Sequence, residues 1–171
     1  MKDRTDFHCD DLLGADYGLL YRAGIRYLFF DIDNTLVPPQ TESPTERVRR
    51  IGVQAREAGL TLGILTNSRN IQRGEAFQKA LGAKWLITEA FKPAPGALRA
   101  VIEAKKLDPR AVCLAGDQLI TDRLCAKWNK IFFVLVKPVV DYDQAATRLN
   151  RLLERPFRRS WERRGLLGLK I

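Results

Sequence analysis

The residues best able to do chemistry in this sequence are four aspartates that follow two apolar runs. Asp31 and Asp33 come after one run, and Asp117 and Asp122 come after another. Carboxylates at the end of a buried strand are costly unless something compensates their charge, and a divalent cation would do so. A site made only of oxygen ligands suits Mg²⁺ rather than zinc. We therefore expect Asp31, Asp33, Asp117 and Asp122 to bind Mg²⁺.

Further polar residues make phosphoryl transfer the reaction that this site suits. Thr66 follows a third apolar run, and Lys92 lies just before Pro93 at the expected start of a helix. With a metal to neutralise phosphate charge, one carboxylate can attack phosphorus while a second handles the leaving-group proton. Thr66 and neighbouring N–H groups would hold phosphate oxygens, and Lys92 would neutralise the charge that spreads over them. Asn34 and Asn67 are the other candidates for binding phosphate.

The elements that must position these residues alternate between strands and helices. Short apolar runs predict buried strands, while prolines, glycines and capping residues bound the helices between them. The strands are expected over 27–30, 60–65, 85–87, 111–115 and 131–136, and the helices over 11–22, 45–58, 70–81, 93–106 and 119–128. This alternation predicts an α/β fold, a Rossmann-like parallel sheet of about five strands with helices on both faces. In such a sheet ligands bind beyond the carboxyl ends of the strands, where all these polar residues should converge.

The composition indicates one globular domain. The chain has 171 residues, of which 46% are hydrophobic and 29% charged, which is enough to form a core. The longest apolar run, Ile131–Val136, is far shorter than the roughly 18 residues that span a bilayer. The N-terminus lacks the apolar segment of a secretory signal, and three cysteines without CxxC spacing argue against a disulfide framework or a zinc site. These features predict a cytoplasmic protein.

The net charge of +9 is concentrated at the C-terminus. Residues 147–171 contain eight basic and two acidic residues, a net charge of +6, with leucines, Phe157 and Trp161 between them. Such a segment attracts polyanions, either nucleic acid or an anionic membrane leaflet. The mixture is equally typical of an interfacial amphipathic helix and of a helix docked on the sheet with its arginines in water.

The four groups of polar residues, in this order, resemble the four motifs of the haloacid dehalogenase (HAD) phosphatase superfamily. The matching positions are Asp31-x-Asp33-x-Thr35, Thr66, Lys92, and Gly116-Asp117-x₄-Asp122, within residues 25–137. The resemblance implies that Asp31 is the nucleophile, which forms an aspartyl-phosphate, and that Asp33 is the general acid and base. It further implies that Thr66 binds phosphate and that Lys92 stabilises the transferring group. Mg²⁺ would be held by Asp31, the main-chain carbonyl of Asp33, Asp117 and Asp122.

The spacing and flanking residues narrow this resemblance. Asp31 and Thr66 are 35 positions apart, and Thr66 and Lys92 are 26 apart, which leaves no room for a separate cap domain. Together with Phe30–Val37 and Gly116–Asp122, this spacing resembles the capless subclass III, YqeG-like group, which is related to the mitochondrial phosphatidylglycerophosphate phosphatases. The resemblance implies an open active site, which in this superfamily accompanies large substrates.

These inferences divide the chain, taken as one domain of residues 1–171, into an N-terminal helix (1–24), a catalytic core (25–137) and a basic C-terminal helical extension (138–171). The leading hypothesis is a phosphatase that acts on a phospholipid headgroup at the inner face of the membrane and converts phosphatidylglycerophosphate to phosphatidylglycerol. One alternative is a nucleotide or nucleic-acid phosphatase. Another is a non-catalytic nucleic-acid-binding protein on the same fold.

Overall fold

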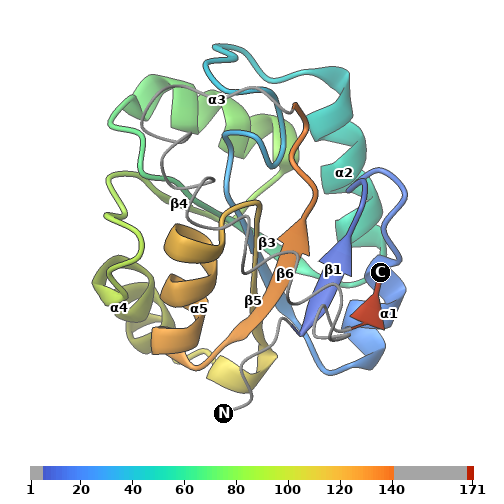
Figure 1. Ribbon diagram of the computed structural model, residues 1–171, viewed down its shortest axis with the longest axis vertical. Helices are drawn as coiled ribbons and strands as arrows, with labels where there is room; N and C mark the ends of the chain where they lie inside the picture. Colours follow the sequence, from blue (N-terminus) through green and yellow to red (C-terminus); the bar gives the residue numbers. More distant parts are fainter. Residues whose placement is uncertain (1–5, 141–168) are drawn as a thin grey trace.

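The computed structural model describes residues 6–140 and 169–171, which form one sheet with helices on both sides (Figure 1). The strands are β1 (Phe7–Cys9), β2 (Tyr27–Phe30), β3 (Thr61–Leu65), β4 (Trp85–Ile87), β5 (Val112–Gly116), β6 (Phe132–Val136) and β7 (Leu169–Lys170). The helices are α1 (Tyr17–Arg22), α2 (Glu46–Glu57), α3 (Ile71–Leu81), α4 (Gly96–Ala104) and α5 (Leu124–Asn129). Short helical turns at Pro109–Ala111 and Leu119–Arg123 lie on either side of β5.

All strand pairs are parallel, and the strand order is β4-β3-β2-β5-β6-β1-β7. The chain order reverses between β2 and β5, which are adjacent at the centre of the sheet. In open α/β sheets the ligand site lies outside the carboxyl ends of the strands at such a reversal. The topology therefore confirms the predicted Rossmann-like parallel fold and directs attention to the ends of β2 and β5.

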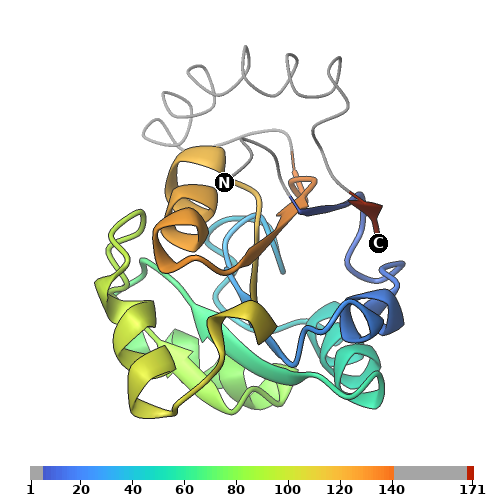
Figure 2. The same cartoon turned by 90° about the horizontal axis from the view of Figure 1, so that it is seen from below.

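The two faces of the sheet are covered by different helices (Figure 2). Alternate residues of β2 point to opposite faces, so Leu28 and Phe30 pack with α1, α2 and α3, whereas Phe29 packs with α4 and α5. Leu28, Phe29 and Phe30 are at most 1% exposed, so both faces of the strand are covered at these residues. A continuous apolar run is what such a two-sided burial requires, which explains why the run at Tyr27–Phe30 predicts a central strand.

Helix α3 shows how local signals set the element bounds. The side chain of Asn70 accepts a hydrogen bond from the N–H of Arg73 at 2.9 Å and so caps the start of the helix. Gly82 ends the helix in the left-handed region at φ 67°, a conformation that costs glycine little. The predicted helix over 70–81 is confirmed by this cap and this terminator.

Within the described residues the sheet has seven strands where about five were predicted, because two short strands at its β6 side, β1 and the edge strand β7, carry little sequence signal. Strand β1 has three residues and β7 has two, and β1 pairs with both β6 and β7. The first helix is also shorter than the predicted 11–22. Asp11 forms a turn in which its carbonyl accepts the N–H of Gly14, and α1 begins only after Asp16, whose carboxylate caps it. Most of the predicted C-terminal extension lies outside the described residues.

The connections between the strands that lead to the site are short. One helix, α2, separates β2 from β3, and one helix, α3, separates β3 from β4. Within residues 6–140 and 169–171, none of the helices is long and apolar enough to span a bilayer.

Candidate active site

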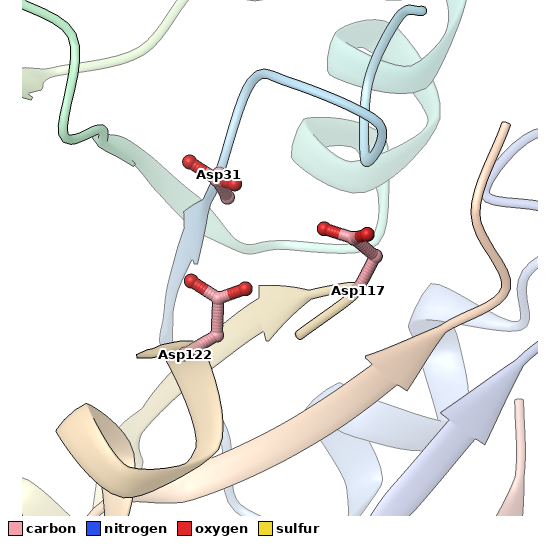
Figure 3. Close-up of side chains that lie close together, drawn as sticks. All are labelled: Asp31, Asp117 and Asp122. Atoms are coloured by element: carbon pink, nitrogen blue, oxygen red, sulfur yellow. The ribbon is translucent and has the colours of Figure 1, made fainter. Parts of the chain in front are cut away.

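Three buried carboxylates meet at the carboxyl ends of β2 and β5 (Figure 3). Asp31 follows β2, Asp117 follows β5, and Asp122 lies in the helical turn Leu119–Arg123. One oxygen from each lies within 4.8 Å of the others, and the three residues are at most 6% exposed. The N–H of Asp31 donates to the carbonyl of Ala115 at 3.0 Å, so the pairing of the two strands continues to the site. The predicted convergence of these aspartates is therefore observed.

Gly116 allows Asp122 to approach the end of β5. A Cβ atom at this position would lie 2.4 Å from both Cγ and Oδ2 of Asp122, a distance that real Cβ atoms do not adopt. The carboxylate also accepts the N–H of Gln118 at 3.1 Å through Oδ2. The absence of a side chain at Gly116 therefore allows the turn to fold back and place Asp122 beside Asp31.

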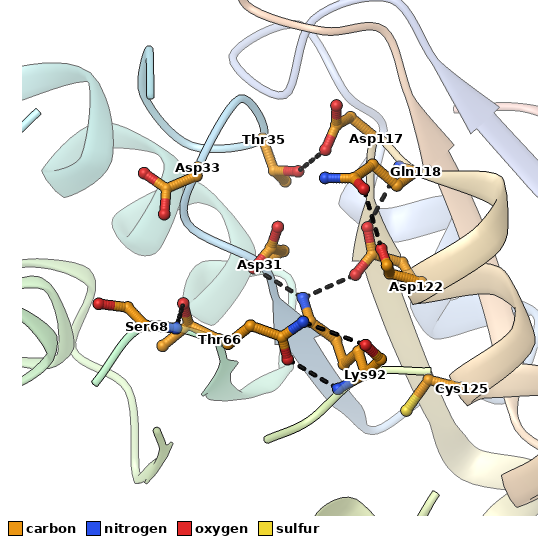
Figure 4. Close-up of polar contacts among 12 residues, drawn as sticks. Asp31, Asp33, Thr35, Thr66, Ser68, Lys92, Asp117, Gln118, Asp122 and Cys125 are labelled. Atoms are coloured by element: carbon orange, nitrogen blue, oxygen red, sulfur yellow. Dashed lines mark hydrogen bonds and ion pairs between the residues drawn. The ribbon is translucent and has the colours of Figure 1, made fainter. Parts of the chain in front are cut away.

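Lys92 lies between two of the carboxylates (Figure 4). Its Nζ is 2.7 Å from Oδ1 of Asp31 and 2.7 Å from Oδ1 of Asp122, and its side chain is 2% exposed. The main chain of Lys92 is fixed by Asn67, whose amide accepts the Lys92 N–H at 2.7 Å and donates to its carbonyl at 3.1 Å. The loop after β3 thus positions the lysine that follows β4.

Burial changes the proton affinity of this pair. Burial disfavours the charged form of Asp31, whereas the nearby Lys92 favours it. The effect of burial is the larger, so the pKa of Asp31 is raised to about 7. Burial also disfavours the Lys92 ammonium, but the carboxylates of Asp122 and Asp31 outweigh it, and the pKa of Lys92 is raised. Lys92 is therefore a permanent cation in the site, whereas Asp31 gains or loses its proton near neutral pH.

The carboxylates fit a divalent metal ion. Ligand oxygens of one Mg²⁺ lie at most about 4.2 Å apart. One oxygen each of Asp31, Asp117 and Asp122 lies within 4.8 Å of the others, so small side-chain movements would bring all three to one ion. Three buried carboxylates close together repel one another, and a divalent cation between them would offset that repulsion. The donor set is all oxygen, which suits Mg²⁺.

Thr66 lies beside this cluster at the end of β3 and is buried. Its hydroxyl oxygen accepts the N–H of Ser68 at 3.2 Å. Its main-chain N–H donates to the carbonyl of Ile87, and its carbonyl accepts the N–H of Ala90. A hydroxyl that accepts one hydrogen bond can still donate its own hydrogen. Thr66 is therefore held where it can donate to a phosphate oxygen above Asp31.

The two asparagines proposed as phosphate ligands have main-chain partners instead. Both ends of the Asn67 amide bond to Lys92. The Asn34 amide accepts the N–H of Val140 at 2.9 Å and donates to its carbonyl at 3.2 Å. Asn34 also adopts φ 61°, which asparagine tolerates better than most residues. Both side chains therefore hold loops together, and their binding to phosphate stays a prediction.

Asp33 does not join the buried cluster, and its carboxylate points away from Asp31 (Figure 4). It forms a two-point ion pair with Arg73 of α3, with Nη2–Oδ1 at 2.7 Å and Nη1–Oδ2 at 3.2 Å. Arg73 was not among the predicted site residues, because a lone arginine in a helix is usually solvated. A signal was present, since residues 73, 77 and 81 lie on one helix face and the last two, Phe77 and Leu81, belong to the core.

Comparisons with known proteins agree with this architecture. No protein-family model matches the chain. The chain is 31% identical over 146 residues to "Probable phosphatase YqeG" of Bacillus subtilis (strain 168), covering 85% of this chain and 84% of that protein.

Two solved structures resemble the fold, each with a TM-score of 0.55. An uncharacterized protein from Listeria monocytogenes serotype 4b is 14% identical, covering 70% of this chain and 85% of that one. D,D-heptose 1,7-bisphosphate phosphatase from B. bronchiseptica, complexed with magnesium and phosphate, is 17% identical, covering 67% of this chain and 82% of that one. At these identities the likeness shows the shared α/β fold.

Proposed function

The chain belongs to the phosphatase family that includes YqeG, and from this premise we propose that it hydrolyses phosphomonoesters with Asp31 as the nucleophile. The observation that carries the proposal is the cluster at the ends of β2 and β5, where Lys92 bridges Asp31 and Asp122 at 2.7 Å each and Asp117 completes a set of buried oxygens. A buried, charge-rich cluster at a strand reversal is costly for a purely structural role.

Binding of the phosphate follows from the groups around Asp31. Asp31, Asp117, Asp122 and the main-chain carbonyl of Asp33 would hold Mg²⁺, which supplies positive charge against the phosphate oxygens. Lys92, whose Nζ is 2.7 Å from both Asp31 and Asp122, contributes a second positive charge beside the nucleophile. The hydroxyl of Thr66 and the N–H groups that begin the following loop donate hydrogen bonds to phosphate oxygens.

The reaction proceeds in two steps. The ionised carboxylate of Asp31 attacks phosphorus, so a bond from Asp31 to phosphorus forms as the bond to the ester oxygen breaks, and Asp33 gives its proton to the departing alkoxide. Water then attacks the aspartyl-phosphate while Asp33 takes a proton from it. This releases inorganic phosphate and restores the Asp31 carboxylate.

A phospholipid headgroup is the substrate we propose, namely phosphatidylglycerophosphate at the inner face of the membrane. Two large apolar side chains support this choice. Phe91, just before Lys92, is 63% exposed, and Ile71, at the start of α3, is 55% exposed. Their loops are joined at the same end of the sheet, where the N–H of Glu89 donates to the carbonyl of Ser68 at 3.0 Å. An apolar rim beside the phosphate site, together with the net charge of +6 over residues 147–171, suits an anionic lipid surface.

The test compares phosphate release from phosphatidylglycerophosphate in anionic vesicles with release from soluble sugar phosphates, with and without Mg²⁺. We expect release from vesicles that requires Mg²⁺, is abolished in Asp31→Asn, and weakens in Phe91→Ser and when arginines of residues 147–171 are neutralised. Lys79→Ser, on the exposed side of α3, is the control for a surface change away from the rim. Hydrolysis of sugar phosphates with none of vesicles would contradict the lipid substrate but leave the phosphatase chemistry standing.

Adding oligonucleotides with a terminal phosphate to this comparison separates the other two hypotheses. A nucleotide or nucleic-acid phosphatase would hydrolyse terminal phosphates of oligonucleotides, with binding that falls steeply with salt. A non-catalytic nucleic-acid-binding protein would bind oligonucleotides and hydrolyse none of these substrates. The buried cluster disfavours this last reading, because its carboxylates serve no evident purpose in a binding protein.

A further inference from the structure

We infer that Arg73 is a positioning residue that holds the carboxylate of Asp33 at the mouth of the site for proton transfer. The inference rests on the proposed function and adds to it a residue that no motif of the sequence includes. It is carried by geometry, since Arg73 contacts Asp33 directly and is itself almost completely buried.

The guanidinium of Arg73 binds two points of the loop that follows β2. Its two terminal nitrogens donate to the two oxygens of Asp33 at 2.7 and 3.2 Å, and its Nε donates to the carbonyl of Thr41 at 2.8 Å. This fork-to-fork arrangement fixes the plane of the carboxylate as well as its distance, which a lysine could not do. Arg73 therefore fixes both the Asp33 carboxylate and the loop segment that follows it.

Arg73 is itself held firmly. Its side chain is 6% exposed, its N–H is bound by the cap residue Asn70, and its guanidinium carbon lies 5.2 Å from the centre of the Phe77 ring. These contacts anchor the group to α3, which packs against β3, β4 and α2. The side chain of Asp33, in contrast, is 39% exposed and would sample several rotamers without a partner.

The loop also bonds to Asp33 from the other side. The N–H of Gln40 donates to Oδ1 of Asp33 at 3.3 Å, and the N–H of Asn34 donates to the carbonyl of Val37 at 2.7 Å, which closes the loop into a compact turn. Gln40 adopts φ 63°, a conformation rare for residues other than glycine, asparagine and aspartate. The backbone strain at Gln40 is thus located where the loop contacts the Asp33 carboxylate.

This placement suits the geometry of the reaction. The leaving oxygen must lie in line with the attacking Asp31 oxygen on the far side of phosphorus. The side chain of Asp31 is 8% exposed and that of Asp33 is 39% exposed, with its carboxylate turned away from Asp31 (Figure 4). When phosphorus is at Asp31, the ester oxygen on its far side therefore lies toward solvent, on the side where Asp33 is exposed. A general acid must also be within hydrogen-bond reach of that oxygen, and misplacement by 1 Å can cost about 10²-fold in rate.

The test uses the leaving group, because only poor leaving groups need a proton. We compare kcat/KM for glycerol phosphate, whose alkoxide needs protonation, with kcat/KM for dinitrophenyl phosphate, whose phenolate does not. This parameter reports the steps through phosphoryl transfer to Asp31. In Arg73→Gln we expect a loss of about 10²-fold for glycerol phosphate and less than about 3-fold for dinitrophenyl phosphate.

Three further variants make the result specific. Asp33→Asn should show the same dependence on leaving group, and adding Arg73→Gln to it should cause no further loss, because both changes remove one function. Arg73→Lys keeps the charge but not the fork, so we expect a loss of about 10-fold on glycerol phosphate alone. If Arg73→Gln does not fold, Arg73→Lys provides the same comparison of the two substrates. Arg47→Gln is the matched control, since Arg47 pairs with Asp11 at 2.7 Å and donates to the carbonyl of Leu36 in the same loop but does not contact Asp33.

The outcomes separate this inference from the proposed function. Equal losses on both substrates in Arg73→Gln and Arg73→Lys, or losses that add to those of Asp33→Asn, would show a merely structural role and overturn the inference alone. A wild-type protein that releases phosphate from neither of these substrates nor from phosphatidylglycerophosphate vesicles in the presence of Mg²⁺ would overturn the proposed function and this inference with it.

Discussion

Replacing Lys92 with methionine tests whether the buried cluster depends on the Lys92 ammonium. The side chain is 2% exposed and lies 2.7 Å from carboxylate oxygens of both Asp31 and Asp122. Methionine fills similar space without charge, so the change isolates the electrostatic contribution. Removing one partner of a buried ion pair costs about 3–5 kcal/mol, because the other partner is left charged and unpaired.

The cost should depend on pH in a defined direction. Burial already raises the pKa of Asp31 to about 7 against the effect of Lys92, so loss of the lysine raises it further. When the pKa of a carboxyl is higher in the folded than in the unfolded state, its protonation stabilises the folded protein at low pH. That stabilisation is fully present below the unfolded-state pKa and is lost as the pH rises through the folded-state pKa. In metal-free protein the free energy of unfolding of Lys92→Met should therefore fall further below that of the wild type as the pH rises above about 7.

Urea unfolding in EDTA, followed by tryptophan fluorescence, measures this effect. Trp85 stacks on the core residue Phe29 with ring centres 5.7 Å apart and reports loss of packing. At a typical slope of about 2 kcal/mol per molar urea, the expected cost lowers the midpoint by about 1.5–2.5 M at pH 8. Lys79→Met, on the exposed side of α3, should change stability by less than about 0.5 kcal/mol. A Lys92→Met midpoint as high as that of the control would refute the reasoning.

Three further results are expected. Gly116→Ala should destabilise the protein by about 1–3 kcal/mol and weaken Mg²⁺ binding in calorimetry, because its Cβ would lie 2.4 Å from the Asp122 carboxyl; unchanged Mg²⁺ affinity would contradict this. Asn67→Ala removes two hydrogen bonds to the Lys92 main chain and should cost about 1–3 kcal/mol in urea unfolding, as well as lowering kcat. Because only ionised Asp31 attacks, kcat/KM should rise with pH near 7, and saturating Mg²⁺ should move that rise to lower pH; a rise that does not move would argue against Asp31 as a ligand.

Much of the fold and part of the site could be predicted because their signals are local. The apolar run before Asp31 and the cap and terminator of α3, Asn70 and Gly82, are each readable within a few residues. The meeting of Asp31 with Asp117 then follows from the rule that carboxyl ends of parallel strands share one edge.

The remaining features depend on contacts between distant residues. The Asn34 amide bonds to Val140, 106 positions away, and Arg73 reaches Asp33 across 40 positions. No spacing rule indicates these partners, since they depend on how α3 and the segment after β6 lie against the loop. Strand β1 has three residues with His8 in the middle, too short and too polar a run to distinguish from a loop.

The central claim is that Asp31 carries the phosphoryl group, and trapping that group tests it most directly. The protein would be mixed with a phosphomonoester and Mg²⁺, quenched within milliseconds, reduced with borohydride, and digested for mass spectrometry. Borohydride converts an aspartyl-phosphate to homoserine, so we expect homoserine at position 31 in the wild type and none in Asp31→Asn. Phosphate release without any modification at position 31, or with homoserine at another aspartate, would contradict the account.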